Sequence, residues 1–304
     1  MAPEVSILIP TYRRPQLLRR AIASALSQDA PVAMEVVVGD DADEGAAIAS
    51  EFDDVRLRYQ ANPDRLGMAG NWNRLCDVAR GDYLVLLNDD DRLLPGFVTT
   101  CMSAFHRMPD LGVVFTNHFF DHGERWEVRR CALEPGRHED FSAKLLRYNP
   151  VPVSASLFRR AAWEHARTLP DTGSADLVLW GRIAERGWPF FYVGDPLMVY
   201  LPHAASVSGA LSFRYDGVVA LEALTMTDPE AERLRRERLA DALVARASVQ
   251  LLEGNARGAT ADLSRAEQLG HTSRRARQLR ALARHRALAR IAARAVQVLP
   301  RRPR

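Results

Sequence analysis

Cysteine is scarce in this sequence, and long apolar runs are missing. The 304 residues include three cysteines, widely spaced and without a CxxC pair, at Cys76, Cys101 and Cys131. This spacing excludes a disulfide framework and a thiolate metal site, and it fits a reducing cytoplasm. No uninterrupted apolar run approaches the roughly 20 residues that a membrane span needs. The chain enters an apolar stretch at Val5 without a charged leader, so we expect no secretory signal.

Acidic residues are absent from the C-terminal arm, which we define as residues 271–304. The arm contains eleven arginines and neither Asp nor Glu. Because the whole chain has a formal net charge of +3, the rest of the chain carries −8. We expect the arm to contact an anionic surface, which is either a membrane, a partner subunit or the acidic body of the protein. Nucleic acid is less favoured, because the arm lacks the interleaved aromatic residues of a single-strand platform.

Strand-like and helix-like segments alternate over the first 90 residues. Buried strands are expected at residues 5–10, 35–39, 55–59 and 83–87, and helices at 17–26 and 70–79. This alternation predicts an α/β fold with a Rossmann-like, mostly parallel sheet flanked by helices. Further along, we expect helices from Pro95 to about residue 108 and at 176–186, and strands at 111–116, 154–158, 190–193 and 197–201. Residues 117–150 show no clear pattern.

The pattern becomes helical towards the C-terminus. Asp228-Pro229 is a helix N-cap followed by proline at the first helical position, and Gly254 is a typical helix end. A second helix is expected at residues 256–269, and a third begins near residue 272. We therefore divide the chain into a sheet domain at residues 1–215 and a helical appendage at residues 216–304.

The most informative stretch is an apolar strand that ends in acid. Residues 83–87 form a continuous apolar run, and Asn88, Asp89, Asp90 and Asp91 follow it. In open α/β sheets, ligands bind at the carboxyl ends of the strands. Three adjacent carboxylates repel one another unless a cation or water screens them, and hard oxygen ligands suit Mg²⁺ or Mn²⁺. A solvated acidic turn that caps the next helix is the alternative interpretation.

Four segments, in this order and spacing, resemble inverting family 2 glycosyltransferases of the GT-A fold. They are VSILIPTYRR at residues 5–14, VVVGDD at 36–41, Asn73, and NDDD at 88–91. The resemblance covers residues 4–210. It implies a nucleotide-diphosphate sugar donor of the UDP, GDP or dTDP type and a Mg²⁺ or Mn²⁺ cofactor. It also implies a glycan or lipid-linked acceptor, used in glycan, polysaccharide or glycolipid assembly in the cytoplasm or at the inner face of the plasma membrane.

The resemblance also implies which residues bind the donor. Pro10, Thr11 and Tyr12 line the base pocket, and Asp41, more than Asp40, faces the base. Arg65 meets a phosphate or a sugar hydroxyl. The complete donor-binding set is Pro10, Thr11, Tyr12, Arg14, Asp40, Asp41, Arg65, Asn73, Asn88 and Asp89.

Metal-binding and catalytic residues follow from the same resemblance. Asn88 replaces the first acid of the family pattern, so Asp90 becomes the expected direct metal ligand, with Asp91 and Asp89 assisting. His203, in a segment similar to the family's closing segment, ligates the metal or hydrogen-bonds the diphosphate. Asp176 is the implied general base, although Ala175 stands where the family usually has Glu.

Two other functions stay open on the sequence. Asn88 and Ala175 are consistent with a scaffold of this fold that has lost catalysis, whereas Asp90 and Asp176 argue against it. A sugar nucleotidyltransferase on a similar sheet would need a Gly-rich phosphate loop after the first strand, and Arg13-Arg14 lacks those glycines.

Overall fold

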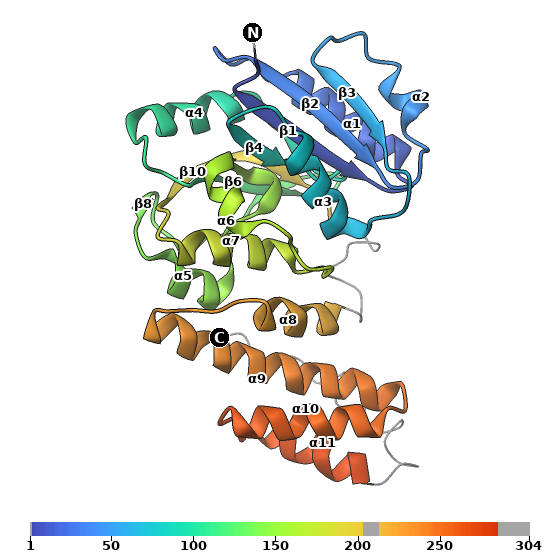
Figure 1. Ribbon diagram of the computed structural model, residues 1–304, viewed down its shortest axis with the longest axis vertical. Coiled ribbons are helices and arrows are strands. Elements are labelled where there is room, and N and C mark those ends of the chain that lie inside the picture. Colours follow the sequence, from blue (N-terminus) through green and yellow to red (C-terminus); the bar gives the residue numbers. More distant parts are fainter. Residues whose placement is uncertain (1, 203–212, 285–304) are drawn as a thin grey trace. The chain divides into compact units, whose positions relative to one another are not determined.

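The computed structural model describes residues 2–202 and 213–284 and divides into two compact units, Met1–Ser206 and Val207–Arg304. The first unit contains the sheet, and the second contains the C-terminal helices (Figure 1). The domain boundary expected after residue 215 stays a prediction, because the unit boundary falls among residues 203–212, outside the described residues.

The first unit is built on a mixed ten-stranded sheet with the order β3-β2-β1-β4-β9-β6-β10-β5, in which β7 pairs with β6 and β8 with β10 (Figure 1). The strands are β1 Val5–Thr11, β2 Met34–Asp40, β3 Leu57–Ala61, β4 Tyr83–Leu86, β5 Arg92–Leu93, β6 Val113–Asp121, β7 Trp126–Val128, β8 Gly136–His138, β9 Ser156–Arg159 and β10 Phe190–Tyr200.

Strand direction divides this sheet into two halves. The parallel half, β3-β2-β1-β4, contains only parallel pairs, as the sequence predicts. In the mixed half, formed by β9, β6, β10 and β5 with β7 and β8, β9 is antiparallel to both β4 and β6, whereas β6 and β10 are parallel. Because β9 opposes both of its neighbours, β4 and β6 run in the same direction. Their carboxyl ends therefore share one edge with those of β1 and β2.

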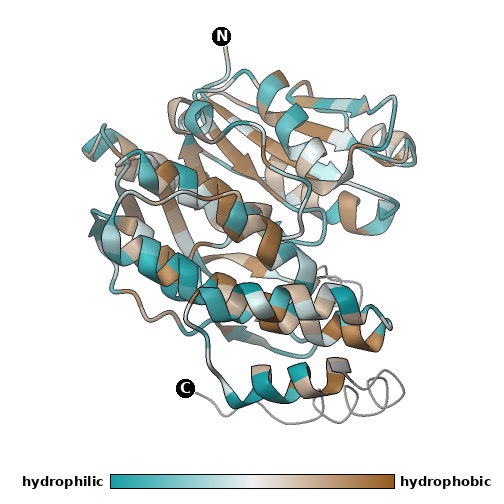
Figure 2. Cartoon of the chain, turned by 60° about the horizontal axis from the view of Figure 1, so that its bottom comes forward, coloured by the Kyte–Doolittle hydropathy of each residue, from teal (hydrophilic) through white to brown (hydrophobic). Residues whose placement is uncertain are grey.

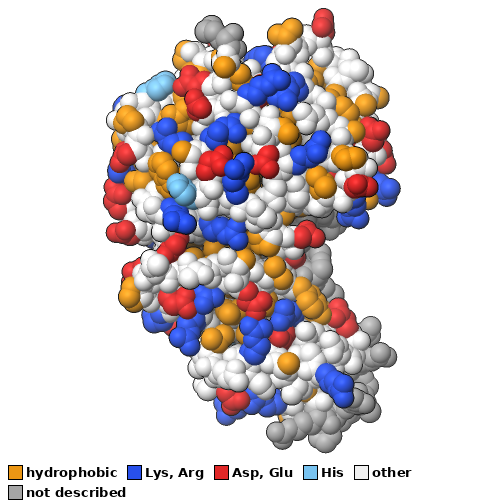
Figure 3. Space-filling model, in the orientation of Figure 1, with side chains coloured by type: hydrophobic (Ala, Val, Ile, Leu, Met, Phe, Trp, Pro, Cys, Tyr) orange, Lys and Arg blue, Asp and Glu red, His pale blue; other side chains and the backbone are white. Residues whose placement is uncertain are grey.

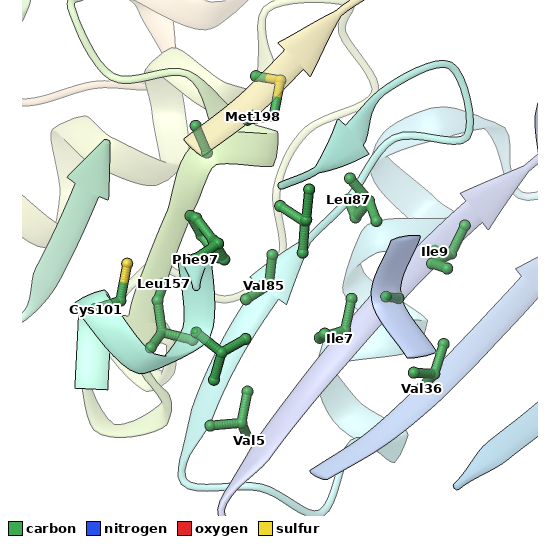
Figure 4. Close-up of a cluster of buried hydrophobic side chains, with 14 of the residues drawn as sticks. Val5, Ile7, Ile9, Val36, Val85, Leu87, Phe97, Cys101, Leu157 and Met198 are labelled. Atoms are coloured by element: carbon green, nitrogen blue, oxygen red, sulfur yellow. The ribbon is translucent and has the colours of Figure 1, made fainter. Parts of the chain in front are cut away.

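Helices cover the sheet on both sides. They are α1 Pro15–Leu26, α2 Ala46–Ala49, α3 Gly67–Val78, α4 Phe97–Arg107, α5 Phe141–Tyr148, α6 Arg160–Ala166 and α7 Ala175–Glu185. Alternate residues of the strands, among them Ile7, Val36 and Val85, form one core with α1 and α4 (Figure 4). Residues on the other face of the strands pack on α3. Gly39 of β2 is required there, because a Cβ at this position would lie 2.4 Å from Oδ1 of Asn71 on α3.

Most expected elements are confirmed, and the differences have local causes. β3 begins at Leu57 rather than residue 55, because Val55 lies fully exposed in a turn. The strands expected at 190–193 and 197–201 are one strand, β10, interrupted by irregular pairing between Val193 and Val199. The region without a clear pattern contains β7, β8 and α5, which are too short to show a periodicity.

The second unit is helical, as expected. Its helices are α8 Phe213–Glu222, α9 Pro229–Leu252, α10 Ala256–Gln268 and α11 Arg274–Arg284. Asp228 caps α9 by accepting a hydrogen bond from the Ala231 backbone N–H at 2.7 Å, and the buried Arg246–Asp262 ion pair joins α9 to α10 at 2.7 Å. Polar residues interrupt the apolar ones along the helices (Figure 2). In the described part of the chain, no helix is long and apolar enough to cross a membrane.

Charged side chains of both signs lie next to one another on the face of the molecule shown in Figure 3. Exposed pairs such as Arg137–Asp110, at 2.6 Å, are typical of the sheet unit. Water screens exposed pairs of this kind, so they contribute little to stability and do not determine the fold. Buried charges lie at the carboxyl edge of the sheet, among them Asp40, Asp89 and Asp91.

Candidate active site

The carboxyl ends of β1 and β4 meet where the strand order reverses. β2 and β3 lie on one side of β1 and β4 lies on the other, which is the position at which open α/β sheets bind ligands. Across this point, Thr11 Oγ1 donates a hydrogen bond of 2.7 Å to Asp89 Oδ2. Both side chains are buried. The bond holds the acidic segment after β4 against the end of β1.

Arg14 lies between two carboxylates of that segment. Its Nη1 is 3.2 Å from Asp89 Oδ1 and 3.0 Å from Asp90 Oδ2. Because Pro15 begins α1, the preceding Arg14 is held at the start of the helix, next to the end of β1. Burial raises the pKa of Asp89 to about 6, although Thr11 and Arg14 favour its charged form. Arg14 therefore supplies positive charge among acids that would otherwise repel one another.

Asp91 is the most buried acid of the segment, with an exposed fraction of 2%. Its backbone N–H donates to the Asn88 carbonyl, and the Asn88 N–H donates to Ser154 Oγ, both at 3.1 Å. Burial raises the pKa of Asp91, and the negative charge of Asp90 raises it further, while hydrogen bonds from Ser154 and Asn88 oppose the shift. Among the described residues, none donates to Asp91 Oδ1.

The oxygens of this segment fit a divalent cation chemically. Asp91 Oδ1 is a buried acceptor without a protein donor in the described part of the chain, and hard cations bind carboxylate oxygens. No group of three or more His, Cys, Asp or Glu side chains in residues 2–202 and 213–284 is arranged to hold a metal by itself. A cation here would therefore need further ligands, such as the phosphates of a substrate. His203, the predicted additional ligand, lies outside the described residues.

Asp40 and Asp41, at the end of β2, have different surroundings. Asp40 is buried, and its two oxygens accept hydrogen bonds of 2.7–3.0 Å from the backbone N–H groups of Ala42, Glu44 and Gly45 and from the Tyr59 hydroxyl. These bonds close the turn after β2. The oxygens of Asp40 are thus occupied by its own loop, and its direct contact with a donor stays a prediction.

Asp41 is oriented by a chain of amides. Asn62 Nδ2 donates to Asp41 Oδ1 at 2.6 Å and to Asn71 Oδ1 at 3.1 Å, and Asn71 Nδ2 donates to the Gly39 carbonyl at 2.7 Å. The Asp41 N–H also donates to the Thr11 carbonyl at 3.0 Å, which places both residues at one sheet edge. Asp41 is partly exposed. This geometry suits an acceptor for a ligand N–H or hydroxyl.

Tyr12, which follows β1 at the carboxyl edge of the sheet, contacts Arg65. The Arg65 guanidinium lies 4.4 Å from the centre of the Tyr12 ring, and that of Arg13 lies 5.1 Å from it. Pro10 precedes this group as a buried residue of β1. The predicted base-pocket segment and Arg65 are therefore neighbours in space, as expected for a shared site.

The loop before α7 packs on α3. Asn73 Nδ2 donates to the Leu169 carbonyl at 3.0 Å, and the Leu169 N–H donates back to Asn73 Oδ1 at 2.9 Å. Asp171 Oδ1 lies 3.2 Å from the position that a Cβ on Gly67 would take. Asn73 thus positions this loop beside the segment that follows Arg65. Its predicted contact with a donor stays a prediction.

Asp176 lies in the first turn of α7, where the helix dipole favours a negative charge. Its Oδ2 accepts a hydrogen bond of 2.8 Å from Asn149 Nδ2, and the side chain is partly exposed. The preceding loop connects α7 to the Asn73 and Gly67 region described above. A carboxylate so placed can accept a proton, and its role as general base stays a prediction.

Sequence reasoning missed three supporting residues. Asn71, Ser154 and Asn149 orient Asp41, Asn88 and Asp176, but none of them belongs to the quoted motifs. Asn71 offered a signal, since it is a polar residue on the apolar side of a helix pattern. Ser154 and Asn149 offered none, because their partners are 66 and 27 residues away in sequence.

Solved structures share this architecture. The structure of S. aureus TarS residues 1–349 in complex with UDP-GlcNAc matches 95% of this chain and 89% of its own chain, with a TM-score of 0.66 and 16% identity. The mannosyltransferase PcManGT from Pyrobaculum calidifontis, in complex with GDP-Man and Mn²⁺, matches 97% and 87%, with a TM-score of 0.56 and 19% identity. The fold of the chain is that of the GT-A glycosyltransferases.

The family is identified by sequence. The model for Glycosyl transferase family 2 matches residues 6–165, which is more than half of the chain and contains residues 6–14, 36–41 and 88–91. This chain belongs to glycosyltransferase family 2. A Campylobacter jejuni relative, the GalNAc(5)-diNAcBac-PP-undecaprenol beta-1,3-glucosyltransferase, is 36% identical over 105 residues. The match covers 33% of this chain and 34% of that protein, so the chain spans about a third of this relative's length.

Proposed function

We propose that this chain transfers a sugar from a nucleoside-diphosphate donor to an acceptor hydroxyl, with inversion at the anomeric carbon. The observation that carries the proposal is the acidic segment at the switch point, where Thr11 and Arg14 hold Asp89 and Asp90 against the end of β1. This segment lies within the family match. The nucleotide sugars named in the two solved structures support the donor class.

The parallel half of the sheet would bind the donor. Tyr12 and Asp41 flank the end of β1, and an oriented carboxylate such as Asp41 accepts hydrogen bonds from a base N–H or a ribose hydroxyl. Arg65, stacked on Tyr12, is in position to meet a phosphate or a sugar hydroxyl. The base can be uracil, guanine or thymine, because each presents an N–H group.

Asp90 and Asp91 would hold Mg²⁺ or Mn²⁺ together with the donor's phosphates, and Asp89 would support them. The cation neutralises charge that develops on the leaving nucleoside diphosphate. Arg14 contacts Asp89 and Asp90 and so balances the same carboxylates. The neighbouring solved structure with Mn²⁺ supports the choice of metal. His203 stays a proposed additional ligand.

Asp176 would act as the general base. An acceptor hydroxyl is a weak nucleophile near neutral pH, and a carboxylate that removes its proton as the new bond forms contributes roughly 10²- to 10⁴-fold. The hydroxyl oxygen attacks the anomeric carbon, the bond to the diphosphate oxygen breaks, and the proton goes to Asp176. A single displacement of this kind inverts the anomeric centre and needs no covalent intermediate.

A thermal-shift screen tests the donor site. The screen compares UDP, GDP and dTDP, each with and without Mn²⁺. One of the three should raise the melting temperature, mainly when the metal is present, because a ligand that binds the native state stabilises it. Asp90→Ala should lose this shift, whereas Asp110→Ala, at an exposed ion pair, should keep it. Undiminished metal-dependent binding to Asp90→Ala, measured by calorimetry, would contradict the site. A response to nucleoside triphosphate with sugar phosphate, but to no nucleotide sugar, would favour a nucleotidyltransferase.

Product stereochemistry tests the reaction. NMR of the product should show the anomeric configuration opposite to that of the donor. Retention would exclude the single displacement. An absence of turnover with every nucleotide sugar that binds would favour a scaffold without catalysis.

The acceptor is proposed to be a glycan or a lipid-linked saccharide at the cytoplasmic face of a membrane. The undecaprenol-linked substrate named for the Campylobacter relative supports this class. The C-terminal arm would attract anionic lipid, with about 1 kcal/mol for each Arg near the surface. Leu279 of α11 is buried within the helical unit, and Arg280 pairs with Glu267 at 2.6 Å. The contact is therefore proposed for the arm beyond α11, whose residues lie outside the described part.

Liposome co-sedimentation of the full chain tests the arm. The matched variant replaces Arg286, Arg290, Arg294 and Arg301 with Gln and keeps α11 intact. The unchanged chain should sediment with anionic vesicles at low salt and lose that binding at high salt, because salt screens exposed charges. Equal sedimentation of both proteins, or no preference for anionic lipid, would contradict the membrane contact.

A further inference from the structure

We propose that Asn149 is a positioning residue, which holds the Asp176 carboxylate in the orientation needed to accept the proton of the acceptor hydroxyl. The proposal rests on the function proposed above, because it assigns a role to the partner of the general base. Asn149 Nδ2 donates to Asp176 Oδ2 over 2.8 Å, although the two residues are 27 positions apart and belong to different elements.

The direction of this hydrogen bond follows from chemistry. An ionised carboxylate has no proton to donate, so the Asn149 amide nitrogen must face it. A bond from a neutral donor to a charged acceptor is stronger than one between neutral groups, and it favours the charged form of the acceptor. Asn149 therefore holds one oxygen of the Asp176 carboxylate in place, as the positioning of a proton acceptor requires.

The backbone at Asn149 is fixed from both sides. Its N–H donates to the Leu145 carbonyl at 2.8 Å and so ends α5. The next carbonyl, that of Pro150, accepts a hydrogen bond of 2.7 Å from Arg129 Nη1. Arg129 is itself attached to the end of β6, because its N–H donates to the His118 carbonyl at 3.0 Å. The position of the Asn149 side chain is thus fixed by hydrogen bonds that lead to the sheet.

The side chain of Asn149 has one feature without a structural explanation in the described part of the chain. Its φ of 39° lies in the left-handed region, but many helices end on a residue in that conformation and Asn tolerates it, so the end of α5 accounts for the backbone. Its Oδ1, however, is buried, and no described residue donates to it. A buried polar atom without a partner lowers stability. This cost is explained if the side chain is retained for the amide N–H that faces Asp176.

The variant Asn149→Gly separates the effect of the side-chain amide from that of the left-handed backbone. Glycine adopts the left-handed conformation freely, so this variant removes the side chain and leaves the turn. The assay measures hydrolytic release of nucleoside diphosphate from nucleotide sugars that carry the base selected by the screen above, with water as the acceptor. We expect kcat to fall about 10- to 100-fold, as for loss of a hydrogen bond to a charged group. The Kd of the nucleoside diphosphate and the melting temperature should stay close to those of the unchanged chain.

The matched control is Asp140→Gly, at the other end of α5. Asp140 is also a left-handed non-glycine residue, with φ of 47°, but it is exposed and precedes the helix. This variant should keep its kcat. Asn149→Asp is the second test of the site, because Asp is of similar size and also tolerates the left-handed region. It places a second carboxylate against Asp176 and should lower kcat at least as much as Asn149→Gly.

A double-mutant cycle decides whether Asn149 acts through Asp176. In the Asp176→Asn background, Asn149→Gly should change the residual kcat by less than about twofold, because the carboxylate base that Asn149 orients is already absent. Multiplicative losses would overturn the proposal, as would an unchanged kcat in Asn149→Gly while Asp176→Asn loses turnover. Full turnover in Asp176→Asn would instead contradict the general base itself and would therefore be a failure of the proposed function.

Discussion

The two halves of the sheet hold their polar residues in different ways. In the parallel half, Asp41 and Asp89 follow strand ends directly, and each is bonded to a neighbour from another segment, Asn62 and Thr11. In the mixed half, the polar residues of interest lie on loops and short elements, and Asp176 is held by Asn149 after α5. One region is organised by the regular sheet, and the other by connections between elements.

We propose that this difference corresponds to the two substrates of the proposed transfer. A donor with a constant nucleotide portion can be recognised by residues that a parallel sheet places at one edge. Acceptors differ widely, and loops can change without disturbing the sheet. We therefore expect variants in the parallel half to change nucleotide binding and variants in the mixed half to change turnover. The following predictions test that division, from the largest expected effect to the smallest.

Asp176→Asn should have the largest effect on activity. The amide keeps the size of the side chain but cannot accept a proton as a base, so kcat should fall roughly 10²- to 10⁴-fold. The Kd of the nucleoside diphosphate, measured by calorimetry, should stay within about twofold, because the change lies in the mixed half. A large loss of nucleotide affinity would show that the two halves are not functionally separate.

His118, on β6, should make the mixed half sensitive to acid. Burial and, to a smaller extent, the charge of nearby Arg129 lower the pKa of His118 to about 4. The native state therefore keeps the ring neutral, while the unfolded chain protonates it near pH 6.5. Above pH 6.5 the ring is neutral in both states, and the free energy of unfolding is not reduced by His118. As the pH falls from 6.5 to 4, the unfolded chain takes up the proton first, and the free energy of unfolding falls by up to about 3 kcal/mol.

His118→Phe tests this linkage by urea unfolding at pH 7 and pH 4.5. Phenylalanine preserves an aromatic ring next to Phe120, whose centroid is 5.0 Å from that of His118, but it does not titrate. The stability of the variant should depend less on pH than that of the unchanged chain. His106→Phe, at an exposed position, is the control and should leave the pH dependence unchanged. Identical pH dependence in all three proteins would contradict the assignment.

The same division explains what could be predicted from the sequence. Strands β1, β2 and β4 are mainly apolar and are followed by polar residues, so the elements could be predicted and candidate site residues could be proposed at their ends. β9 was found as a strand, but its antiparallel pairing with β4 and β6 depends on tertiary contacts that no local pattern contains. Asn149 and Ser154 were missed for the same reason: their roles arise from partners distant in sequence.

Asp40 shows the limit of a motif. The Asp40-Asp41 pair was expected to contribute to the donor site, and the resemblance favoured Asp41. The structure supplies a physical basis for that preference, because the Asp40 oxygens accept three hydrogen bonds from its own loop and one from Tyr59 of β3, whereas Asp41 is partly exposed. Two adjacent carboxylates look equivalent in a sequence, and only the turn geometry distinguishes them.

Thr11→Val should weaken the parallel half. Valine has nearly the shape of threonine but no hydroxyl, so Asp89 Oδ2 would lose its 2.7 Å donor in a buried position. An acceptor left unpaired there costs about 1–3 kcal/mol of unfolding free energy. Thr99→Val is the matched control, because the Thr99 hydroxyl bonds the Asp29 carbonyl at an exposed position. Chemical denaturation of both variants should show the loss in Thr11→Val only, and equal losses would contradict the special role of the switch point.

Asn62→Ala should have the smallest effect, confined to recognition of the base. Asn62 Nδ2 lies 2.6 Å from Asp41 Oδ1 and fixes the direction in which that carboxylate points. Without it, Asp41 keeps its charge but samples more rotamers, so nucleotide binding should lose about 1 kcal/mol, or roughly five-fold in Kd. Calorimetry should show this loss for the nucleoside diphosphate selected by the screen and none for pyrophosphate, which lacks base and ribose. An equal loss of affinity for both ligands would show that Asp41 acts on the phosphate portion of the ligand and does not recognise the base. No loss for either ligand would mean that the amide chain of Asn62 and Asn71 serves only to attach α3 to β2.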